Sequence, residues 1–433
     1  MEGAVQVEAG SDVSEALLSQ ARAAKAAARK LVGLSTTVKN RALLAIADAL
    51  VANQEEILDA NAQDVERARD AGLDAAPLNR LRLTPEKIAA IAGDVRTVAS
   101  LPDPVGEVID GWRLPNGLQV SRRRVPLGVI AAIFESRPNV TVDIASLCLK
   151  SGNACVLRGG SEAILSNTVL ARIAAAAERD AGVPEGALQF IASTDRALVA
   201  ELLKLREEID LVVPRGGAEL IRFVAENARM PVLTGGTGVC HTYVDRAADL
   251  EKAVAIAFNA KTRNWSICNA LDTLLVHHDV AAAFLPRVRE RWGEAGIEMR
   301  CDERSLACFR GDGGARVVPA GEGDFGREFL APVASVRVVD SLDEAIEHVA
   351  TYGTGHSDAI ITEDYAAASR FMEEVDTAVV YVNASTQFTD GAQFGLGAEI
   401  IDSTQKTVAR GPVGLREITT YKWFVYGEGQ VRP

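Results

Sequence analysis

The first ninety residues alternate apolar and polar positions with the period of an α-helix. Alanine and leucine recur every three or four residues from Ser14 to about Ile91. Gly72 closes the second long stretch, as expected where a helix ends. Because many faces of these helices carry alanine, which permits close approach, we predict that they cover a sheet rather than form a bundle.

The pattern changes near Pro104. The segment "DGWRLPNGLQVSRRRVPLG" contains two extended runs separated by a turn at Pro115–Gly117. A turn of this composition between two such runs is typical of a β-hairpin. The β-rich end of the chain, "TTYKWFVYGEG", carries four aromatic residues and suits pairing with another element or subunit.

From residue 128 onward, short β-rich runs alternate with helical stretches. The predicted strands lie at 128–134, 153–159, 188–193, 210–216, 230–236, 271–277, 332–340, 357–363 and 377–384. Such alternation implies right-handed βαβ units and largely parallel, doubly wound sheets in two α/β regions. The glycine-rich segment 300–326 is irregular, and we predict a loop there.

Length and charge narrow the class of protein. A chain of 433 residues is expected to form two or three domains. The formal net charge of −13 argues against nucleic acid or an anionic membrane as the main partner. No apolar run approaches the ~18 residues of a membrane span, and the acidic start "MEGAVQVEAG" lacks the plan of a signal peptide. Six cysteines without a CxxC pair suit a reducing compartment, so we predict a cytoplasmic protein.

Two predicted strands end in Arg-Gly-Gly, at Arg158–Gly160 and Arg215–Gly217. A strand that ends this way and opens a helix presents backbone N–H groups and a guanidinium to an anion. Two such turns in one sheet suggest a phosphate-bearing ligand at the carboxyl ends of its strands. The glycine-rich run Thr234–Val239 fails the spacing of a dinucleotide fingerprint, so a simple turn explains it equally well.

A third polar group follows the first predicted strand of the α/β region. Arg137 is suited to hold a carboxylate or phosphate, and the Asn139 amide is suited to donate to an oxyanion. Asn139 also precedes a helical stretch, where a helix N-cap is the modestly favoured interpretation on local sequence alone.

Cys268 lies on a loop before the predicted strand 271–277. Lys261 and Arg263 lie nearby in sequence and favour a thiolate, but no histidine is positioned by sequence to act as its base. On local pattern alone a buried, unreactive cysteine is the more common case. We expect no metal site, because the histidines are scattered and the neighbours His277 and His278 would point to opposite faces of a strand.

Long segments of the chain resemble one known family. They are "VPLGVIAAIFESRPNVTVDIASLCLKSGNACVLRGGSEAILSN", "VPRGGAELIRFVAENARMPV", "NAKTRNWSICNALDTLLVH", "YGTGHSDAIIT", "VNASTQFTDGAQFGLGAEI" and "STQKTVARGPVGLREITTYKW". The family is the γ-glutamyl phosphate reductases, also called glutamate-5-semialdehyde dehydrogenases, within the aldehyde dehydrogenase superfamily. The resemblance runs nearly end to end.

The resemblance implies an α/β, aldehyde-dehydrogenase-like fold in three parts. They are a doubly wound, Rossmann-type cofactor domain (1–107 and 128–244), an α/β catalytic domain (245–400) and a small β oligomerisation hairpin (108–127 and 401–433). It also implies an oxidoreductase of proline biosynthesis in which NADPH reduces L-glutamyl 5-phosphate to the semialdehyde through a cysteine thioester. The expected partners are this acyl-phosphate substrate, further copies of the chain in a dimer or tetramer, and glutamate kinase as a candidate.

The resemblance also implies roles for particular residues. Cys268 would be the nucleophile, and Asn139 would stabilise the oxyanion with the Cys268 N–H. The expected cofactor-binding residues are Arg158, Gly159 and Gly160 at the adenosine ribose, Pro214, Arg215, Gly216 and Gly217 near the pyrophosphate, and Glu328 at the nicotinamide ribose. The expected substrate cations are Arg137, Lys261, Arg263 and Lys406, with Arg410 as a further candidate.

The chain departs from the family pattern at three places near the expected substrate. Residues Thr234–Val239 replace Glu-Thr-Gly-Val-Gly-Asn, Asn264–Trp265 stand where Arg-Pro is usual, and Ile401–Val408 replace Gly-Ile-Ser-Thr-Gln-Lys-Leu-His. These changes leave open a paralogue of the same fold that acts on a different acyl-phosphate or aldehyde. They also leave open a catalytically silent, nucleotide-binding scaffold.

Overall fold

The computed structural model describes residues 6–309 and 313–432, which form two compact units. The first unit contains the described residues through Thr234, together with Gly395–Ile401 and the segment from Val413 onward. The second contains Gly235–Phe394 and Asp402–Pro412. Residues 1–5 of the acidic start and residues 310–312 of the predicted loop lie outside the described residues. The three-part domain division stays a prediction.

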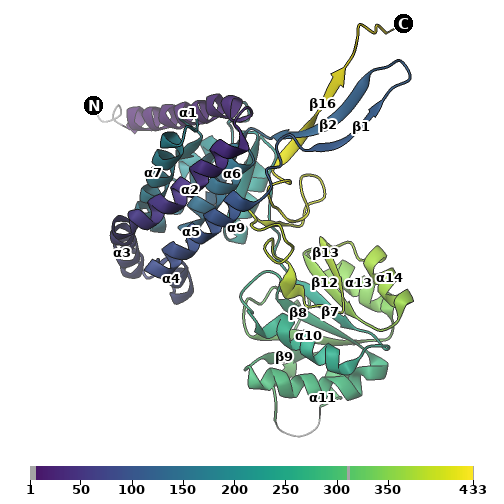
Figure 1. Cartoon of the computed structure of the whole chain (residues 1–433). Helices are drawn as coiled ribbons and strands as arrows, with labels where there is room; N and C mark the ends of the chain where they lie inside the picture. Colours follow the sequence, from purple (N-terminus) through teal and green to yellow (C-terminus); the bar gives the residue numbers. More distant parts are fainter. Residues whose placement is uncertain (1–5, 310–312, 433) are drawn as a thin grey trace. The chain divides into compact units, whose positions relative to one another are not determined.

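The first unit begins with the predicted helices, which lie around a four-stranded parallel sheet (Figure 1). The helices are α1 (Gln6–Leu31), α2 (Thr36–Ala52), α3 (Gln54–Asp70), α4 (Ala75–Leu81), α5 (Pro85–Ser100), α6 (Asn139–Lys150), α7 (Ile164–Asp180), α8 (Ala197–Leu202), α9 (Ala218–Asn227) and the 3-10 turn η1 (Ser161–Ala163). The sheet has the order β5-β4-β3-β6, with β3 at Val129–Phe134, β4 at Ala154–Arg158, β5 at Leu188–Phe190 and β6 at Leu211–Arg215. The predicted doubly wound α/β region is confirmed.

The strand order explains how this sheet is covered. The connections β3-α6-β4 and β4-α7-β5 move in one direction across the sheet, whereas β5-α8-β6 returns in the other. Right-handed crossovers therefore place α6 and α7 on one face and α8 on the opposite face, where α1 packs against it. The order reverses between β3 and β6, and open α/β sheets bind ligands at such a point.

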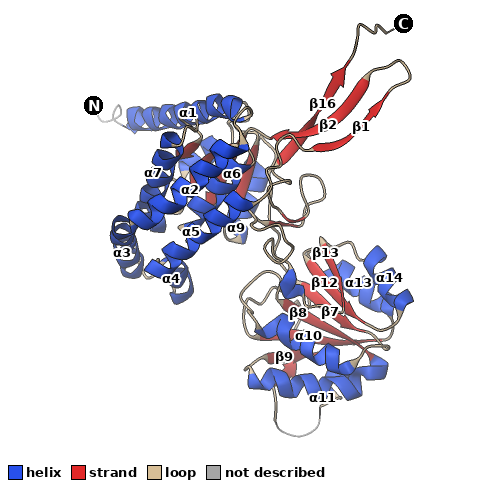
Figure 2. Ribbon diagram, viewed as in Figure 1, coloured by secondary structure: helices blue, strands red, loops and turns tan. Residues whose placement is uncertain are grey.

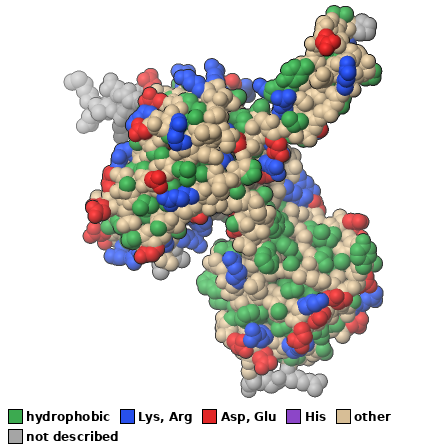
Figure 3. Space-filling model, viewed as in Figure 1, with side chains coloured by type: hydrophobic (Ala, Val, Ile, Leu, Met, Phe, Trp, Pro, Cys, Tyr) green, Lys and Arg blue, Asp and Glu red, His purple; other side chains and the backbone are tan. Residues whose placement is uncertain are grey.

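A separate three-stranded antiparallel sheet has the order β1-β2-β16 (Figure 2). It joins the predicted hairpin, β1 (Val108–Arg113) and β2 (Gln119–Pro126), to the end of the chain, β16 (Thr419–Tyr426). Trp112 and Trp423 are exposed on it and meet edge to face, with ring centroids 5.7 Å apart. Val108, Ile109, Tyr421, Val425 and Tyr426 are further exposed hydrophobic residues of this sheet, and Figure 3 shows separate hydrophobic side chains on it. Its predicted role in oligomerisation stays a prediction.

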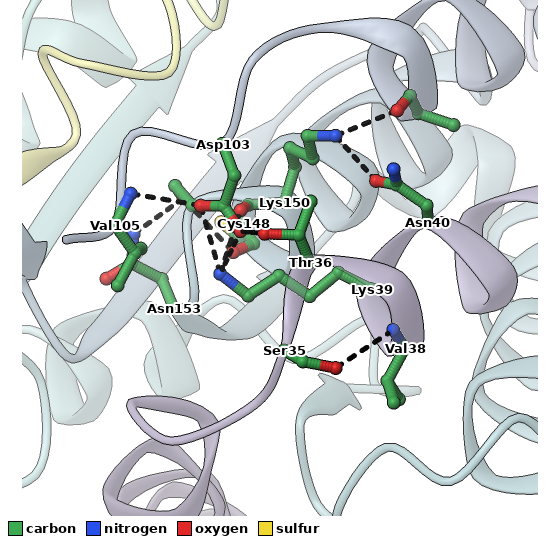
Figure 4. Close-up of polar contacts among 12 residues, drawn as sticks. Ser35, Thr36, Val38, Lys39, Asn40, Asp103, Val105, Cys148, Lys150 and Asn153 are labelled. Atoms are coloured by element: carbon green, nitrogen blue, oxygen red, sulfur yellow. Dashed lines mark hydrogen bonds and ion pairs between the residues drawn. The ribbon is translucent and has the colours of Figure 1, made fainter. Parts of the chain in front are cut away.

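Two buried lysines link the helical layer of the first unit (Figure 4). Lys39 Nζ lies 3.0 Å from Asp103 Oδ2 and 3.3 Å from the Lys150 carbonyl oxygen. Lys150 Nζ donates to Asn40 Oδ1 at 2.6 Å and to the Ala99 carbonyl at 2.8 Å, and burial lowers its pKa. These contacts connect α2, α5 and α6 through charges that water does not screen.

We expect the Asp103→Asn variant to lose about 3–5 kcal/mol in its free energy of unfolding, because it leaves the Lys39 charge buried without its counterion. Denaturant unfolding followed by circular dichroism measures this loss. The Asp48→Asn variant breaks an exposed ion pair with Arg96 and is the control, with an expected change of at most about 1 kcal/mol. Equal losses in the two variants would contradict the prediction.

The second unit is built on a seven-stranded parallel sheet of order β10-β9-β11-β8-β7-β12-β13. The strands are β7 (Cys240–Val244), β8 (Leu271–His277), β9 (Glu298–Cys301), β10 (Val317–Pro319), β11 (Val333–Val339), β12 (Ser357–Ile361) and β13 (Val379–Val382). The helices are α10 (Leu250–Thr262), α11 (His278–Glu294), α12 (Glu303–Leu306), α13 (Leu342–Tyr352), α14 (Tyr365–Glu374) and the 3-10 turn η2 (Thr386–Phe388). A two-stranded ladder, β14 (Asp402–Ser403) with β15 (Gly411–Pro412), completes it.

Separate hydrophobic cores lie on the two faces of this sheet. One contains Phe284 and Trp292 of α11 with alanines of α10, and the other contains Phe371 of α14 and Val349 of α13. The predicted parallel sheet is again confirmed.

Three expectations about local structure are corrected. The segment 300–326 is not one irregular loop, because it contains α12 and also β10, which extends the sheet by pairing with β9. The run 230–236 forms no strand in the described chain, only isolated bridges from Val232 to Val212 and from Gly235 to Ser403, because Pro231 has no N–H to continue a ladder. His278 does not alternate with His277 on a strand; it opens α11, and the two rings stack with centroids 4.5 Å apart. The search for membrane spans found no sufficiently long apolar helix among the described residues.

Candidate active site

The loop that carries Cys268 lies at one edge of the seven-stranded sheet. β8, β7 and β12 are neighbouring parallel strands, so their amino ends meet at the same edge. Gly238 precedes β7, Cys268 precedes β8 and His356 immediately precedes β12. The fold therefore gathers three segments that are far apart in sequence around one cysteine.

Hydrogen bonds hold the main chain around Cys268 from two sides. The Cys240 thiol donates to the Cys268 carbonyl at 3.2 Å, and burial raises the pKa of that thiol well above its usual range, so its proton stays in place. On the other side, Asn269 Nδ2 donates to the Thr389 carbonyl at 2.8 Å and Thr386 Oγ1 donates to the Asn269 carbonyl at 2.6 Å. Cys268 itself is only half-buried, as a reactive thiol must be.

A histidine and a carboxylate lie beside this thiol. Cys268 Sγ, a ring nitrogen of His356 and a carboxylate oxygen of Asp402 all lie within 4.8 Å of one another. Position in the sequence indicated no histidine as a base for Cys268, and the fold brings His356 beside it. The sequence signal was that Cys268 and His356 both precede predicted strands, but the pairing order that makes these strands neighbours is not readable from sequence.

The predicted substrate cations of the second unit are already paired. Lys261 is fully buried with Nζ 3.3 Å from Asp272 Oδ1, and burial lowers the pKa of Lys261 and raises that of Asp272 to about 6. Arg263 is exposed and donates to Gln387 Oε1 at 3.1 Å. Lys406 and Arg410 both pair with Asp376. Their roles in binding substrate stay predictions.

The residues just before Cys268, where the chain departs from the family pattern, form a turn. Asn264 Oδ1 accepts from the backbone N–H and the hydroxyl of Ser266, at 3.0 and 2.8 Å, which fixes a turn two residues before Cys268. Trp265 within this turn is 41% exposed. Glu328, the residue expected at the nicotinamide ribose, accepts from the Gly238 N–H at 2.9 Å and so lies close to the Cys268 loop.

In the first unit, Asn139 does not cap its helix. It is the first residue of α6, the cap position is Pro138, and no side chain makes a capping bond, so the N-cap interpretation is wrong. Asn139 Nδ2 instead donates to Asp143 Oδ2 at 2.8 Å, and burial raises the pKa of Asp143 to about 6. Arg137 is exposed just before the helix. The amide of Asn139 is thus held by its own helix.

The first Arg-Gly-Gly turn is densely packed. Arg158 ends β4, is only 8% exposed, and its Nε has no hydrogen-bond partner among the described residues. A Cβ at Gly159 would lie 2.0 Å from Asn167 Nδ2, and one at Gly160 would lie 2.1 Å from Glu162 Oε1. A side chain at either position would therefore require Asn167 or Glu162 to move.

The second Arg-Gly-Gly turn, at Arg215–Gly217, already donates a hydrogen bond to a carboxylate of the same chain. Pro214 and Arg215 end β6, and Gly217 precedes α9. Glu135, just after β3, accepts from the Gly217 N–H at 3.0 Å, at the point where the sheet order reverses. A Cβ at Gly216 would lie 2.4 Å from the same carboxylate. The Gly217 N–H at this helix start is thus already paired with a carboxylate of the same chain, and the predicted phosphate contact of the turn stays a prediction.

Comparison with known proteins places these features in a family. The model of the aldehyde dehydrogenase family matches residues 3–304 and 322–423. The γ-glutamyl phosphate reductase of Dehalococcoides mccartyi is 55% identical over 413 residues, covering 95% of this chain and 97% of the relative. That of Roseiflexus castenholzii is 56% identical, covering 94% and 97%.

Solved structures show the same relationship. The crystal structure of γ-glutamyl phosphate reductase from Thermotoga maritima is 48% identical, covers 96% of this chain and 100% of its own, and has a TM-score of 0.93. An acetylating aldehyde dehydrogenase from Geobacillus thermoglucosidasius, at 21% identity and a TM-score of 0.68, shares the fold. The predicted fold class and family are confirmed.

Proposed function

Because the chain belongs to the aldehyde dehydrogenase family, we propose that it reduces L-glutamyl 5-phosphate to L-glutamate 5-semialdehyde and phosphate, a step of proline biosynthesis. The observation that carries this proposal is the similarity, at 48–56% identity over nearly the whole chain, to γ-glutamyl phosphate reductases. The local geometry supports it, since the half-buried Cys268 stands on a loop whose main chain is held on both sides.

In this reaction the Cys268 thiolate attacks the acyl carbon and expels phosphate, which leaves a thioester on the enzyme. The backbone N–H of Cys268 and the amide of Asn139, assigned by the resemblance, stabilise the oxyanion of the tetrahedral intermediate. A strong general acid is not needed to protonate the leaving group, because phosphate leaves readily. The thiol must nevertheless lose its proton before or during the attack.

The family uses nicotinamide cofactors, and we propose NADPH for this chain. When bound, the cofactor supplies the hydride that reduces the thioester. Arg158 fits a 2′-phosphate, because its buried Nε has no partner among the described residues and a buried donor gains from an anionic acceptor. Burial lowers the pKa of Arg158, but the guanidinium stays charged at neutral pH. The other predicted contacts, Gly159, Gly160, Pro214–Gly217 and Glu328, remain part of this proposal.

The assembly and the location are also proposed. The exposed apolar side chains of the β1-β2-β16 sheet, with Trp112 and Trp423 among them, favour a homo-oligomer formed through this sheet. Association with glutamate kinase and a cytoplasmic location stay predictions. Among the functions considered, the similarity to the reductases favours this one over a paralogue or a silent scaffold.

We expect the purified chain to oxidise L-glutamate 5-semialdehyde only when phosphate is present, because phosphate must cleave the thioester in the reverse direction. NADP⁺ is expected to be used at least about tenfold better than NAD⁺, since one hydrogen bond to a charged group contributes about 1.5–3 kcal/mol. The absorbance of the reduced nicotinamide cofactor measures both the dependence of the rate on phosphate and the preference for NADP⁺ over NAD⁺. Sulfate is the control anion, and a rate that is independent of phosphate would contradict the proposal.

A further inference from the structure

The imidazole of His356 is oriented by a row of hydroxyl groups. His356 Nδ1 lies 2.9 Å from Ser357 Oγ, Ser357 Oγ lies 2.7 Å from Thr389 Oγ1, and Thr389 Oγ1 lies 2.8 Å from the Tyr381 hydroxyl. His356, Ser357 and Thr389 are buried, whereas Tyr381 is half-buried. The row therefore leads from the neighbourhood of Cys268 toward a less buried position.

Each hydrogen bond in this row can form with either of its two groups as the donor. In one arrangement, Nδ1–H donates to Ser357, which donates to Thr389, which donates to Tyr381; in the other, every bond is reversed. The first arrangement leaves a lone pair on His356 Nε2, and the second leaves a proton there. Nε2 is buried and has no hydrogen-bond partner among the described residues. Reversing the row thus moves one proton between Nε2 and Tyr381.

We propose that His356 accepts the proton of the Cys268 thiol, and that Ser357, Thr389 and Tyr381 relay protons between His356 and solvent. This inference rests on the proposed function, in which Cys268 is the nucleophile. A His356 nitrogen lies within 4.8 Å of Cys268 Sγ, which a small side-chain movement or one water spans. The relay supplies the base that the sequence did not reveal.

The protons balance over both halves of the reaction. In the first half, the S–C bond forms and the C–O bond to phosphate breaks, while the thiol proton passes through His356 to the departing phosphate, which leaves as HPO₄²⁻. In the second half, the thioester carbon receives hydride, the C–S bond breaks and the sulfur leaves with the electron pair. The thiolate then takes up one solvent proton through the relay, which matches the one proton consumed per turnover.

Burial sets the protonation state of His356 at rest. It lowers the pKa of the imidazole to about 4, against the opposing effect of the Asp358 carboxylate, so the ring is neutral above that pH and holds a proton from Cys268 only briefly before passing it on. The other titratable groups that face it are Cys268 and Asp402, with Tyr381 at the far end of the row. Once protonated, the imidazolium lies within 4.8 Å of the Asp402 carboxylate, which stabilises it.

The His356→Gln variant tests the proposal, because glutamine retains hydrogen-bonding groups but is not a base. We expect kcat to fall by about 100-fold or more with KM nearly unchanged, as for loss of a general base. The rate of Cys268 alkylation by iodoacetamide, followed by mass spectrometry, is expected to require a higher pH than in the parent. Imidazole added to a His356→Ala variant is expected to restore part of the activity. The control, His348→Gln, removes another buried imidazole of the same unit and is expected to leave the alkylation profile unchanged.

Ser357→Ala is the second variant, should His356→Gln fail to fold as judged by its melting temperature. It interrupts the row but keeps His356, so we expect slower turnover with an alkylation profile like that of the parent. An unchanged kcat and alkylation profile in His356→Gln, with Cys268→Ser inactive, would overturn the relay and leave the proposed function intact. An active Cys268→Ser would overturn the proposed nucleophile as well.

Discussion

The Cys268→Ser variant is expected to lose at least about 10⁴-fold in kcat, because a serine hydroxyl beside the same groups is a far weaker nucleophile than a thiolate. No other described group in the Cys268 cluster can replace it, since His356 is buried and Asp402 would form a less reactive anhydride-type intermediate. Phosphate-dependent NADP⁺ reduction with the semialdehyde measures the loss, and mass spectrometry after incubation with substrate checks that no thioester forms.

The control for this substitution is Cys308→Ser. Cys308 is also half-buried, but its Sγ donates to the Arg304 carbonyl at 3.5 Å and its side chain packs against the core of the second unit. We expect its activity to match that of the parent. Loss of less than about tenfold in Cys268→Ser would place the nucleophile elsewhere, and equal loss in both variants would indicate a general effect on folding.

The fold was largely predictable because periodicity and turn residues act locally. The alternation of apolar runs and helical stretches predicted both parallel sheets, and the "PNG" turn predicted the β1-β2 hairpin. The prediction of a strand at 230–236 was wrong because one proline decides whether a β-rich segment can continue a ladder. The pattern of apolar and polar residues contains no information about a missing N–H. The pairing of β16 with β2 was left open, since strand partners far apart in sequence are set by tertiary packing.

The candidate site was predictable only in part. Cys268 and Asn139 were found through the resemblance, whereas local sequence favoured packing for one and a helix cap for the other. His356 was missed because its distance from Cys268 depends on the strand order β8-β7-β12. In this order β8 and β12 are separated by β7 alone, although their first residues, Leu271 and Ser357, are 86 residues apart in sequence. The predicted phosphate contact at Gly217 stays a prediction, since the N–H of this residue is occupied by the Glu135 side chain.

A second large effect is expected from Gly238→Ala, which tests whether the backbone packing beside the nucleophile is required. A Cβ at position 238 would lie 1.6 Å from the Cys268 carbonyl oxygen and 2.5 Å from its carbonyl carbon. These are backbone atoms and cannot rotate away, so the Cys268 loop must shift. The Gly238 N–H is also held by Glu328 at 2.9 Å, so the glycine cannot retreat without breaking that bond. We expect kcat to fall by about 100-fold, the scale of a 1 Å misplacement of a reacting group.

The matched control is Gly93→Ala, because a Cβ at Gly93 within helix α5 meets nothing within 4 Å. That variant is expected to keep full activity and to gain up to about 1 kcal/mol in its free energy of unfolding, the usual advantage of alanine over glycine in a helix. Steady-state kinetics and thermal unfolding of both variants separate the two effects. Parent-like kinetics in Gly238→Ala would mean that the Cys268 loop tolerates displacement. A loss of activity with a nearly unchanged melting temperature would instead show that Gly238 is required for placing the sulfur atom rather than for folding.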